Sequence, residues 1–512
     1  MWFKTTCALL SALSLGCGAS SPPPDPATDS GAADTADTAD TAPLPEIVWG
    51  PCPDRFRDQC AKIAVPLDHA HPEGETIDVH LSRRGSGPRQ LWLLQGGPGA
   101  SAESYYGLHD FLTNLDKDLE VYTLEFRGVG ESGRLGCVAE KGGTPGGTRL
   151  LLTEWPACRD DVVARLGSKL SFYNSTQAAH DLDVAISRTA RAGQKTFVYG
   201  ASYGTYWAHR FAVLHPTRAA GVILDAPVQP GAQLHRYDLA FDPIGRKVFG
   251  ELCPKSARCA AHLGADPLAT LDRVVASLKT GHCDSLGVSF DTWKSVFAVF
   301  LMDYNLRNWL PAVIYRLDRC NDADQAAIAA LFGNIFKGAG VPRTSAVTQV
   351  SVILSEFWPR EHVDEAEITA AGAKATFFQN ANAPSYAMQD SWPRYPVDPV
   401  AMKYASPEVP ILTLAGTLDP AAPPALVGYG YRDNLKGPHQ TFVEIPYGAH
   451  VVLTSGSVGP DVPGCPAQLL RAFLLDPKSA LPVDCATKVL NPSFDAPTAT
   501  ATKYFGTADL YD

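Results

Sequence analysis

The chain has 512 residues, and its 43 lysines and arginines are outnumbered by 54 aspartates and glutamates, giving a net charge of −11. This balance provides no basic surface of the kind that binds nucleic acid, so nucleic acid is not an expected partner. Hydrophobic residues make up 45% of the chain, which is typical of a globular protein with a large core.

The start of the chain is typical of an export signal. Lys4 gives a positive start, residues 7–15 are apolar and Gly16 is small. This apolar stretch is too short to span a bilayer as a permanent helix. The sequence L-S-L-G at 13–16, just before Cys17, resembles a bacterial lipobox. It implies that Cys17 carries a lipid, so that the protein contacts the membrane through this anchor alone; simple secretion is the alternative.

Residues 18–45 are rich in Ser, Pro, Thr, Ala and Asp and contain almost no large apolar side chain. Such a segment cannot bury enough surface to fold, so we expect a flexible tether between the anchor and a folded body.

The cysteines indicate an oxidising compartment. With Cys7 in the signal and Cys17 set aside, ten of the 12 cysteines remain, and they fall into neighbours along the chain. In an exported protein this pattern suggests disulfides, although the sequence leaves their connectivity open. The pairs of neighbours are Cys52 and Cys60, Cys137 and Cys158, Cys253 and Cys259, Cys283 and Cys320, and Cys465 and Cys485. Their spacing does not fit a zinc site, and no metal or other cofactor is implied.

Short apolar runs alternate with helical patterns in the first half of the body. This alternation predicts a parallel sheet covered by helices on both faces. Strands are expected at 61–67, 76–82, 91–94, 119–124, 196–199 and 222–224, and helices at 177–192 and 206–214.

The pattern changes after Pro230 and becomes mainly helical, with helix-type spacing at 267–278, 293–302, 310–317 and 323–332. Strands return at 409–415 and 441–445, followed by a helix near 467–475. We therefore predict the following organisation: signal and lipobox 1–17, linker 18–45, first part of the core 46–230, helical cap 231–400, and second part of the core with a C-terminal tail 401–512.

The sequence G-A-S-Y-G at 200–204 is the central motif of the first part of the core. It fits G-x-S-x-G, in which a serine sits on a sharp turn between a strand and a helix. A side chain two residues before or after the serine would collide with the neighbouring backbone, so both places are Gly. Ser202 is therefore the predicted nucleophile.

A serine nucleophile needs a base, and the base needs an orienting acid. Asp419 and His450 follow two later predicted strands, in the order Ser, acid, His, and at the carboxyl ends where sites of open α/β sheets form. We predict His450 as the base and Asp419 as its partner. Asp225 is the competing acid, because it also ends a predicted strand.

The sequence Q-G-G-P-G at 95–99 follows another predicted strand and suits an oxyanion hole, which needs a backbone N–H that no side chain obstructs. The N–H groups of Gly97 and Tyr203 are the predicted donors.

These motifs resemble the prolyl iminopeptidase group of α/β-hydrolases. Its H-G-G-P-G-x-S loop is similar to residues 95–101 here, and its D-x-R-G-x-G-x-S turn to residues 125–132. The elbow at 200–205 resembles that of the secreted tripeptidyl aminopeptidase branch. Two residues depart from the pattern: Gln95 stands where His is usual, and Glu125 stands where Asp is usual. Both can still form hydrogen bonds to the loop.

The resemblance implies an α/β-hydrolase fold with a helical cap, and an aminopeptidase of prolyl or tripeptidyl type that acts on peptides with a free N-terminus. It also implies an acidic cap residue that holds the substrate's ammonium group. The sequence S-V-I-L-S-E at 351–356 is similar to a family segment, which makes Glu356 the candidate anchor. A carboxylesterase with the same triad and a surface binding protein without catalysis are the alternatives.

Overall fold

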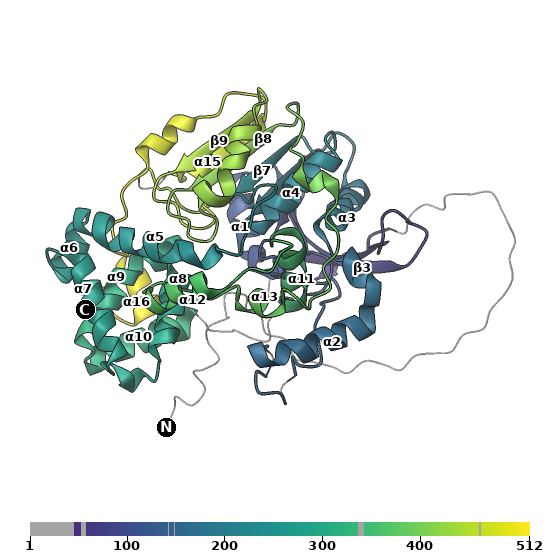
Figure 1. Ribbon diagram of the computed structural model, residues 1–512. Coiled ribbons are helices and arrows are strands. Elements are labelled where there is room, and N and C mark those ends of the chain that lie inside the picture. The colour runs from purple at the N-terminus through teal and green to yellow at the C-terminus, as the bar shows by residue number, and fades with distance from the viewer. Residues whose placement is uncertain (1–45, 53–57, 142, 148, 336–342, 460–461) are drawn as a thin grey trace, which may run out of the picture.

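The computed structural model describes residues 46–52, 58–141, 143–147, 149–335, 343–459 and 462–512 (Figure 1). The predicted signal peptide, the linker and Cys17 lie outside these residues, so the predictions about them stay predictions. Within the described ranges, no helix is both long enough and apolar enough to cross a membrane.

One nine-stranded sheet organises the described residues, with the strand order β1-β2-β3-β5-β4-β6-β7-β8-β9. Neighbours from β5 through β4 to β9 are parallel, whereas β1, β2, β3 and β5 are joined by antiparallel pairs. The mostly parallel sheet is thus confirmed. Its strands are β1 (Gly50–Pro51), β2 (Gln59–Pro66), β3 (Thr76–Gly85), β4 (Arg89–Leu94), β5 (Leu119–Leu124), β6 (Lys195–Ala201), β7 (Gly221–Asp225), β8 (Ile411–Gly416) and β9 (Gln440–Ile445).

The register of the central strands brings their carboxyl ends together. In β5 and β8 every residue is buried, as expected for strands covered on both faces. Leu94 of β4 is paired with Gly200 of β6, and Ala201 is paired with Asp225 of β7. The loops that follow β4, β6 and β7 therefore leave the sheet at one edge.

Helices cover both faces of the sheet. Apolar residues of α1 (Tyr106–Leu115) and α15 (Cys465–Leu475) pack on one face. Those of α3 (Ser175–Thr189), α4 (Tyr203–Leu214) and α14 (Tyr429–Asn434) pack on the other. The helices predicted at 177–192, 206–214 and 467–475 correspond to α3, α4 and α15, while α1, α14 and α2 (Trp155–Leu166) were not anticipated.

Between β7 and β8, every regular element of the described residues is helical, and we call residues 231–400 the cap. Figure 1 shows α5 to α10 grouped beside the sheet, with α11 and α13 nearer to it. The helices predicted at 267–278, 293–302, 310–317 and 323–332 are α7 to α10. The cap helices are α5 (Phe241–Lys247), α6 (Ala257–Leu263), α7 (Pro267–Lys279), α8 (Phe290–Met302), α9 (Tyr304–Arg319), α10 (Asp322–Ile335), α11 (Ala346–Glu356), α12 (Ala366–Lys374) and α13 (Ala383–Met388).

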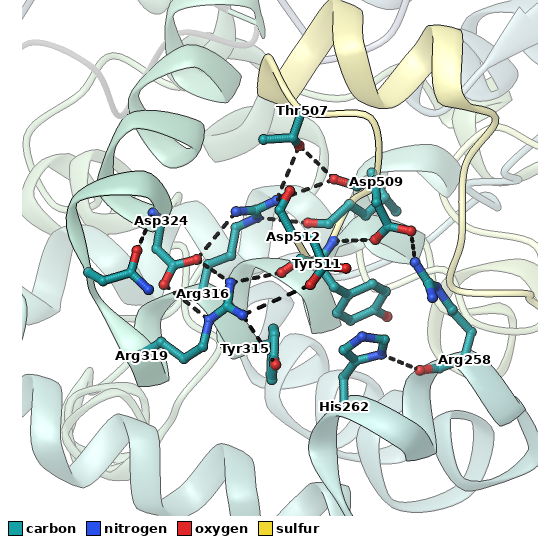
Figure 2. A network of polar contacts seen from close by, with 12 residues as sticks. Arg258, His262, Tyr315, Arg316, Arg319, Asp324, Thr507, Asp509, Tyr511 and Asp512 are labelled. Atoms are coloured by element: carbon teal, nitrogen blue, oxygen red, sulfur yellow. Dashed lines mark hydrogen bonds and ion pairs between the residues drawn. The ribbon is translucent and has the colours of Figure 1, made fainter.

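The C-terminal tail packs on the cap, although the sequence placed it with the second part of the core. Helix α16 (Thr498–Phe505) contacts α10, and Phe505 and Tyr511 join the buried core of the cap. Figure 2 shows two arginines of α9 that bind the backbone of the tail: Arg316 Nε donates to Leu510 O at 2.7 Å, and Arg319 Nη2 donates to Tyr511 O at 2.8 Å. The tail therefore ties the cap to the end of the core.

All five disulfides form between the neighbours that the sequence suggested, with Cα–Cα distances from 4.8 to 5.7 Å. Two of them lie in the cap, where they join Cys253 to Cys259 and Cys283 to Cys320. Disulfides persist in oxidising compartments, which agrees with an exported protein.

Candidate active site

Ser202 lies on the sharp turn between β6 and α4. Its backbone has φ 58° and ψ −130°, a conformation that is unfavourable for a residue with a side chain. The Ser202 N–H donates a hydrogen bond to Asp225 O at 2.9 Å, which anchors the turn to the end of β7. A strained serine at the start of a helix is the geometry of a nucleophile elbow.

The two glycines of the motif are required by the close packing of this turn. A Cβ on Gly200 would lie 2.1 Å from Gly204 O, and one on Gly204 would lie 2.1 Å from Leu94 O. Both neighbours are backbone atoms, which cannot move aside as a flexible side chain could. The steric argument from the sequence thus holds in the structure.

The loop after β4 lies directly against the nucleophile. A Cβ on Gly96 would lie 2.7 Å from Ser202 Cβ and 3.1 Å from Ser202 Oγ. Gly97 follows with φ 112°, a conformation that favours glycine. Among the described residues, the N–H groups of Gly97 and Tyr203 have no hydrogen-bond acceptor. Both are therefore free to stabilise an oxyanion beside Ser202, which is the role predicted for them.

The two side chains that depart from the family pattern both support this loop. Gln95 Oε1 accepts a hydrogen bond from the Gly96 N–H at 2.7 Å. Glu125 Oε1 accepts one from Ser101 Oγ at 2.7 Å, and its Oε2 accepts one from the Glu131 N–H at 2.6 Å. Burial raises the pKa of Glu125 to about 7, although these hydrogen bonds oppose the rise.

Asp419 and the partly exposed His450 form a pair beyond the ends of β8 and β9. His450 Nδ1 lies 2.8 Å from Asp419 Oδ2 and 3.0 Å from Oδ1. Asp419 is fully buried, and its Oδ1 also accepts hydrogen bonds from the N–H groups of Ala421 and Ala422, each at 2.8 Å. Burial alone would lower the pKa of His450, but the charge of Asp419 and its hydrogen bond raise that pKa above the usual 6.5. This is the arrangement of a base and its orienting acid.

Asp225, the competing acid, is engaged elsewhere. Its carboxylate accepts hydrogen bonds from the Tyr199 hydroxyl at 2.6 Å and from the N–H groups of Val452 and Leu453 at 2.8 and 3.0 Å. Burial raises the pKa of Asp225 to about 6. Because His450 Nδ1 faces Asp419, Asp225 serves to hold the loop that follows His450.

The same residue links the nucleophile to the base. Asp225 accepts from the Ser202 N–H through its carbonyl and from the loop after His450 through its carboxylate. The Ser202 hydroxyl has no hydrogen-bond partner among the described residues. The hydrogen bond between Ser202 Oγ and His450 that catalysis needs is therefore not formed in this structure. Such hydrogen bonds are often long or poorly aligned before substrate binds.

Residues 91–252 match a family model described as the alpha/beta hydrolase fold. The chain has the α/β-hydrolase fold. Over 208 residues it is 28% identical to a tripeptidyl aminopeptidase of Streptomyces lividans, an alignment that covers 36% of this chain and 38% of that protein. Over 234 residues it is 27% identical to the serine protease Hip1 of Mycobacterium tuberculosis, covering 42% of this chain and 44% of Hip1. The matched part thus spans less than half the length of these curated relatives.

Among solved structures, the chain is similar to a carboxyl esterase from Bacillus coagulans. The TM-score is 0.30 and the sequence identity is 11%, over 77% of this chain and 92% of that one.

Glu356, the predicted ammonium anchor, ends helix α11 with its side chain only 2% exposed. Its Oε1 accepts hydrogen bonds from the N–H and the hydroxyl of Ser175, at 3.1 and 2.9 Å, and from the Tyr395 hydroxyl at 2.8 Å. Arg210 Nη2 lies 3.8 Å from Oε2. Glu356 lines a cavity of about 540 Å³, and its Oε2 has no hydrogen-bond partner among the described residues. The contacts of Oε1 fit a structural role, whereas Oε2 is left without a hydrogen-bond partner, so the ammonium anchor stays a prediction.

This buried carboxylate supports the residue next to the nucleophile. The Tyr203 hydroxyl lies 2.7 Å from Ser175 Oγ, which in turn donates to Glu356. Sequence reasoning missed Ser175 and Tyr395, because they lie 181 and 39 residues from Glu356 and belong to no motif. Only the folded chain brings them together.

In the described parts of this α/β-hydrolase fold, no group of three or more His, Cys, Asp or Glu side chains could hold a metal ion. The candidate site consists of the serine, the histidine, the carboxylate and the backbone donors described above.

Proposed function

We propose that the chain is an exported serine hydrolase, and specifically an aminopeptidase that cleaves peptides near a free N-terminus through an acyl-enzyme on Ser202. The observation that supports this most is the Asp419–His450 pair, 2.8 Å apart beyond the strand ends, on a scaffold that holds Ser202 in a strained turn. The names of the relatives favour peptide substrates over other acyl compounds.

In the proposed mechanism, Ser202 Oγ attacks the carbonyl carbon of the scissile bond while His450 Nε2 takes the hydroxyl proton. Asp419 holds the imidazole through Nδ1 and stabilises its cationic form. The N–H groups of Gly97 and Tyr203 bind the oxygen that becomes negatively charged. His450 then protonates the leaving amine, the C–N bond breaks and the acyl group remains on Ser202. Water, activated by His450, hydrolyses this ester and restores the enzyme.

Export is proposed on separate grounds. The five disulfides are typical of an oxidising compartment, and the N-terminal sequence resembles a signal ending in a lipobox. We propose lipidation of Cys17 as the means of membrane attachment. Mass spectrometry of the N-terminal peptide from exported protein would test it.

A digest of a peptide library, followed by mass spectrometry, tests the activity, with Ser202→Ala as the matched control. We expect release of one or a few residues from free N-termini and no turnover by Ser202→Ala, whose fold stays intact. Residual turnover above about a thousandth of wild type would contradict the role of Ser202.

N-acetylated copies of the cleaved peptides and simple esters separate the alternatives. Loss of cleavage on acetylation supports an aminopeptidase, whereas turnover confined to esters supports a carboxylesterase. A fluorophosphonate probe that fails to label Ser202 would support a binding protein without catalysis.

A further inference from the structure

Two hydrogen bonds join the cap to the loop that carries His450. The His450 N–H donates to Met302 O, the last residue of α8, at 3.0 Å. Arg307 Nη2, from the first turns of α9, donates to Tyr447 O, 140 residues further along the chain. The junction of α8 and α9 thus lies directly against the candidate base.

The loop itself needs such external support. Tyr447 has φ 58°, a conformation that costs free energy in a residue with a Cβ and persists only where the surroundings fix it. The Tyr447 N–H donates to Thr417 Oγ1 at 2.9 Å, on the core side. The Tyr447 carbonyl is held from the cap side by Arg307. The conformation of residues 447–450 therefore depends on both parts of the molecule.

The buried position of Arg307 is unfavourable for a cation. Its side chain is fully buried, and its Nε and Nη1 have no hydrogen-bond acceptor among the described residues. Burial lowers its pKa to about 10, while the nearby Tyr304, Asp303 and Asp419 raise it. A buried cation with incomplete pairing usually costs more stability than an apolar side chain of the same size. Its contribution to stability therefore does not account for the position of Arg307, whereas its bond to the loop and its closeness to Asp419 do.

We infer that Arg307 is a positioning residue for His450: by holding the Tyr447 carbonyl against the cap, it fixes the loop in the orientation that lets the imidazole face Ser202. The inference rests on the proposed function, since it assigns a role within that same site. It predicts that the base is correctly placed only while the α8–α9 junction is docked on the loop.

Arg316 provides a matched control on the same helix. It is also fully buried, but its guanidinium binds the C-terminal tail and Asp324, as Figure 2 shows. Arg316→Met should lower the thermal stability of the protein without affecting the base. Arg307→Met removes a buried cation of the same kind from the other end of the helix.

The experiment compares Arg307→Met, Arg307→Lys, Arg316→Met and Ser202→Ala in the full chain. It measures thermal stability, kcat and KM on a cleaved peptide, and the rate constant for labelling by a fluorophosphonate, which reports the reactivity of Ser202 whatever the natural substrate is. A small displacement of a catalytic group can cost about 100-fold in rate. We expect Arg307→Met to slow labelling and lower kcat by about 10- to 100-fold, with KM within about threefold and thermal stability at or above that of wild type.

Arg307→Lys should recover part of the rate, because an ammonium can still donate to the Tyr447 carbonyl. Labelling of Arg307→Met at the wild-type rate overturns the inference, as does an equal rate loss in Arg316→Met. Should Arg307→Met fail to fold, Arg307→Gln decides, since it is polar but too short to reach the carbonyl: a rate within about threefold of wild type overturns the inference, and a loss of tenfold or more supports it. Turnover by Ser202→Ala would instead refute the proposed function, whatever Arg307 does.

Discussion

Replacing Asp419 by asparagine tests the assignment of the acid, because the structure fixes how the new amide must lie. Asp419 Oδ1 accepts two backbone N–H groups, from Ala421 and Ala422, both at 2.8 Å. The amide oxygen of asparagine must keep this place, since the NH₂ group would otherwise face two donors. The NH₂ group then points at His450 Nδ1, where Oδ2 lay 2.8 Å away.

This orientation forces the imidazole into the wrong tautomer. Nδ1 must accept from the amide, so the ring carries its proton on Nε2 and cannot take the proton of Ser202. The same change in a serine protease triad lowers kcat by about 10⁴, which corresponds to about 5.4 kcal/mol of transition-state stabilisation. We expect a loss of that size for Asp419→Asn, with little change in KM.

The assay is kcat on a cleaved peptide together with the rate of fluorophosphonate labelling, and Asp225→Asn is the matched variant. Asp225→Asn also removes one charge at the end of a strand, but it leaves the Asp419–His450 pair in place. It should lower stability, since Asp225 holds the loop after His450, and should cost far less activity than Asp419→Asn. Folded Asp419→Asn with kcat within tenfold of wild type would refute the reasoning. A larger loss in Asp225→Asn would make Asp225 the acid.

Two further predictions concern pH and the buried Glu356. His450 must be neutral to act as a base, and its pKa is raised above 6.5, so kcat/KM should fall as the pH drops through a value above 6.5. A pH profile of kcat/KM with its acid limb below pH 6 would contradict this. Glu356→Gln removes the charge beside Arg210 and should destabilise the fold by about 1–3 kcal/mol, while KM for free N-terminal peptides changes less than about threefold. A rise in KM of tenfold or more for these peptides would support Glu356 as the ammonium anchor.

The parts of the site that lie on local motifs could be predicted from the sequence. Ser202 was identified because its elbow needs a fixed spacing of glycines, and the contacts of Gly200 and Gly204 show why. The buried strand at 119–124 was predicted with its observed bounds, because four of its six residues are large and apolar, although Glu120 and Thr123 interrupt them. Disulfides between neighbouring cysteines were predicted for a similar reason, as each closes a short loop of 6 to 37 residues.

The rest depended on packing between distant segments, which leaves no mark on a single sequence. Nothing in the sequence around Glu356 indicates that its carboxylate meets Ser175, 181 residues away. The tail was assigned to the core by its position in the chain, yet its apolar residues complete the cap. Arg307 is an ordinary arginine in an amphipathic helix, and only its complete burial beside the histidine loop distinguishes it.

The cap contacts the candidate site through two loops, the oxyanion loop after β4 and the loop that carries His450. On one side, the Ser345 N–H donates to Gly99 O at 2.9 Å, in the loop that carries the oxyanion donor Gly97. The packing is so close that a Cβ on Gly99 would lie 2.5 Å from Ser345 O. On the other side, Met302 O holds the His450 N–H. Because the cap contacts both the loop of the base and the oxyanion loop, changes in cap packing should appear in kcat as well as in KM.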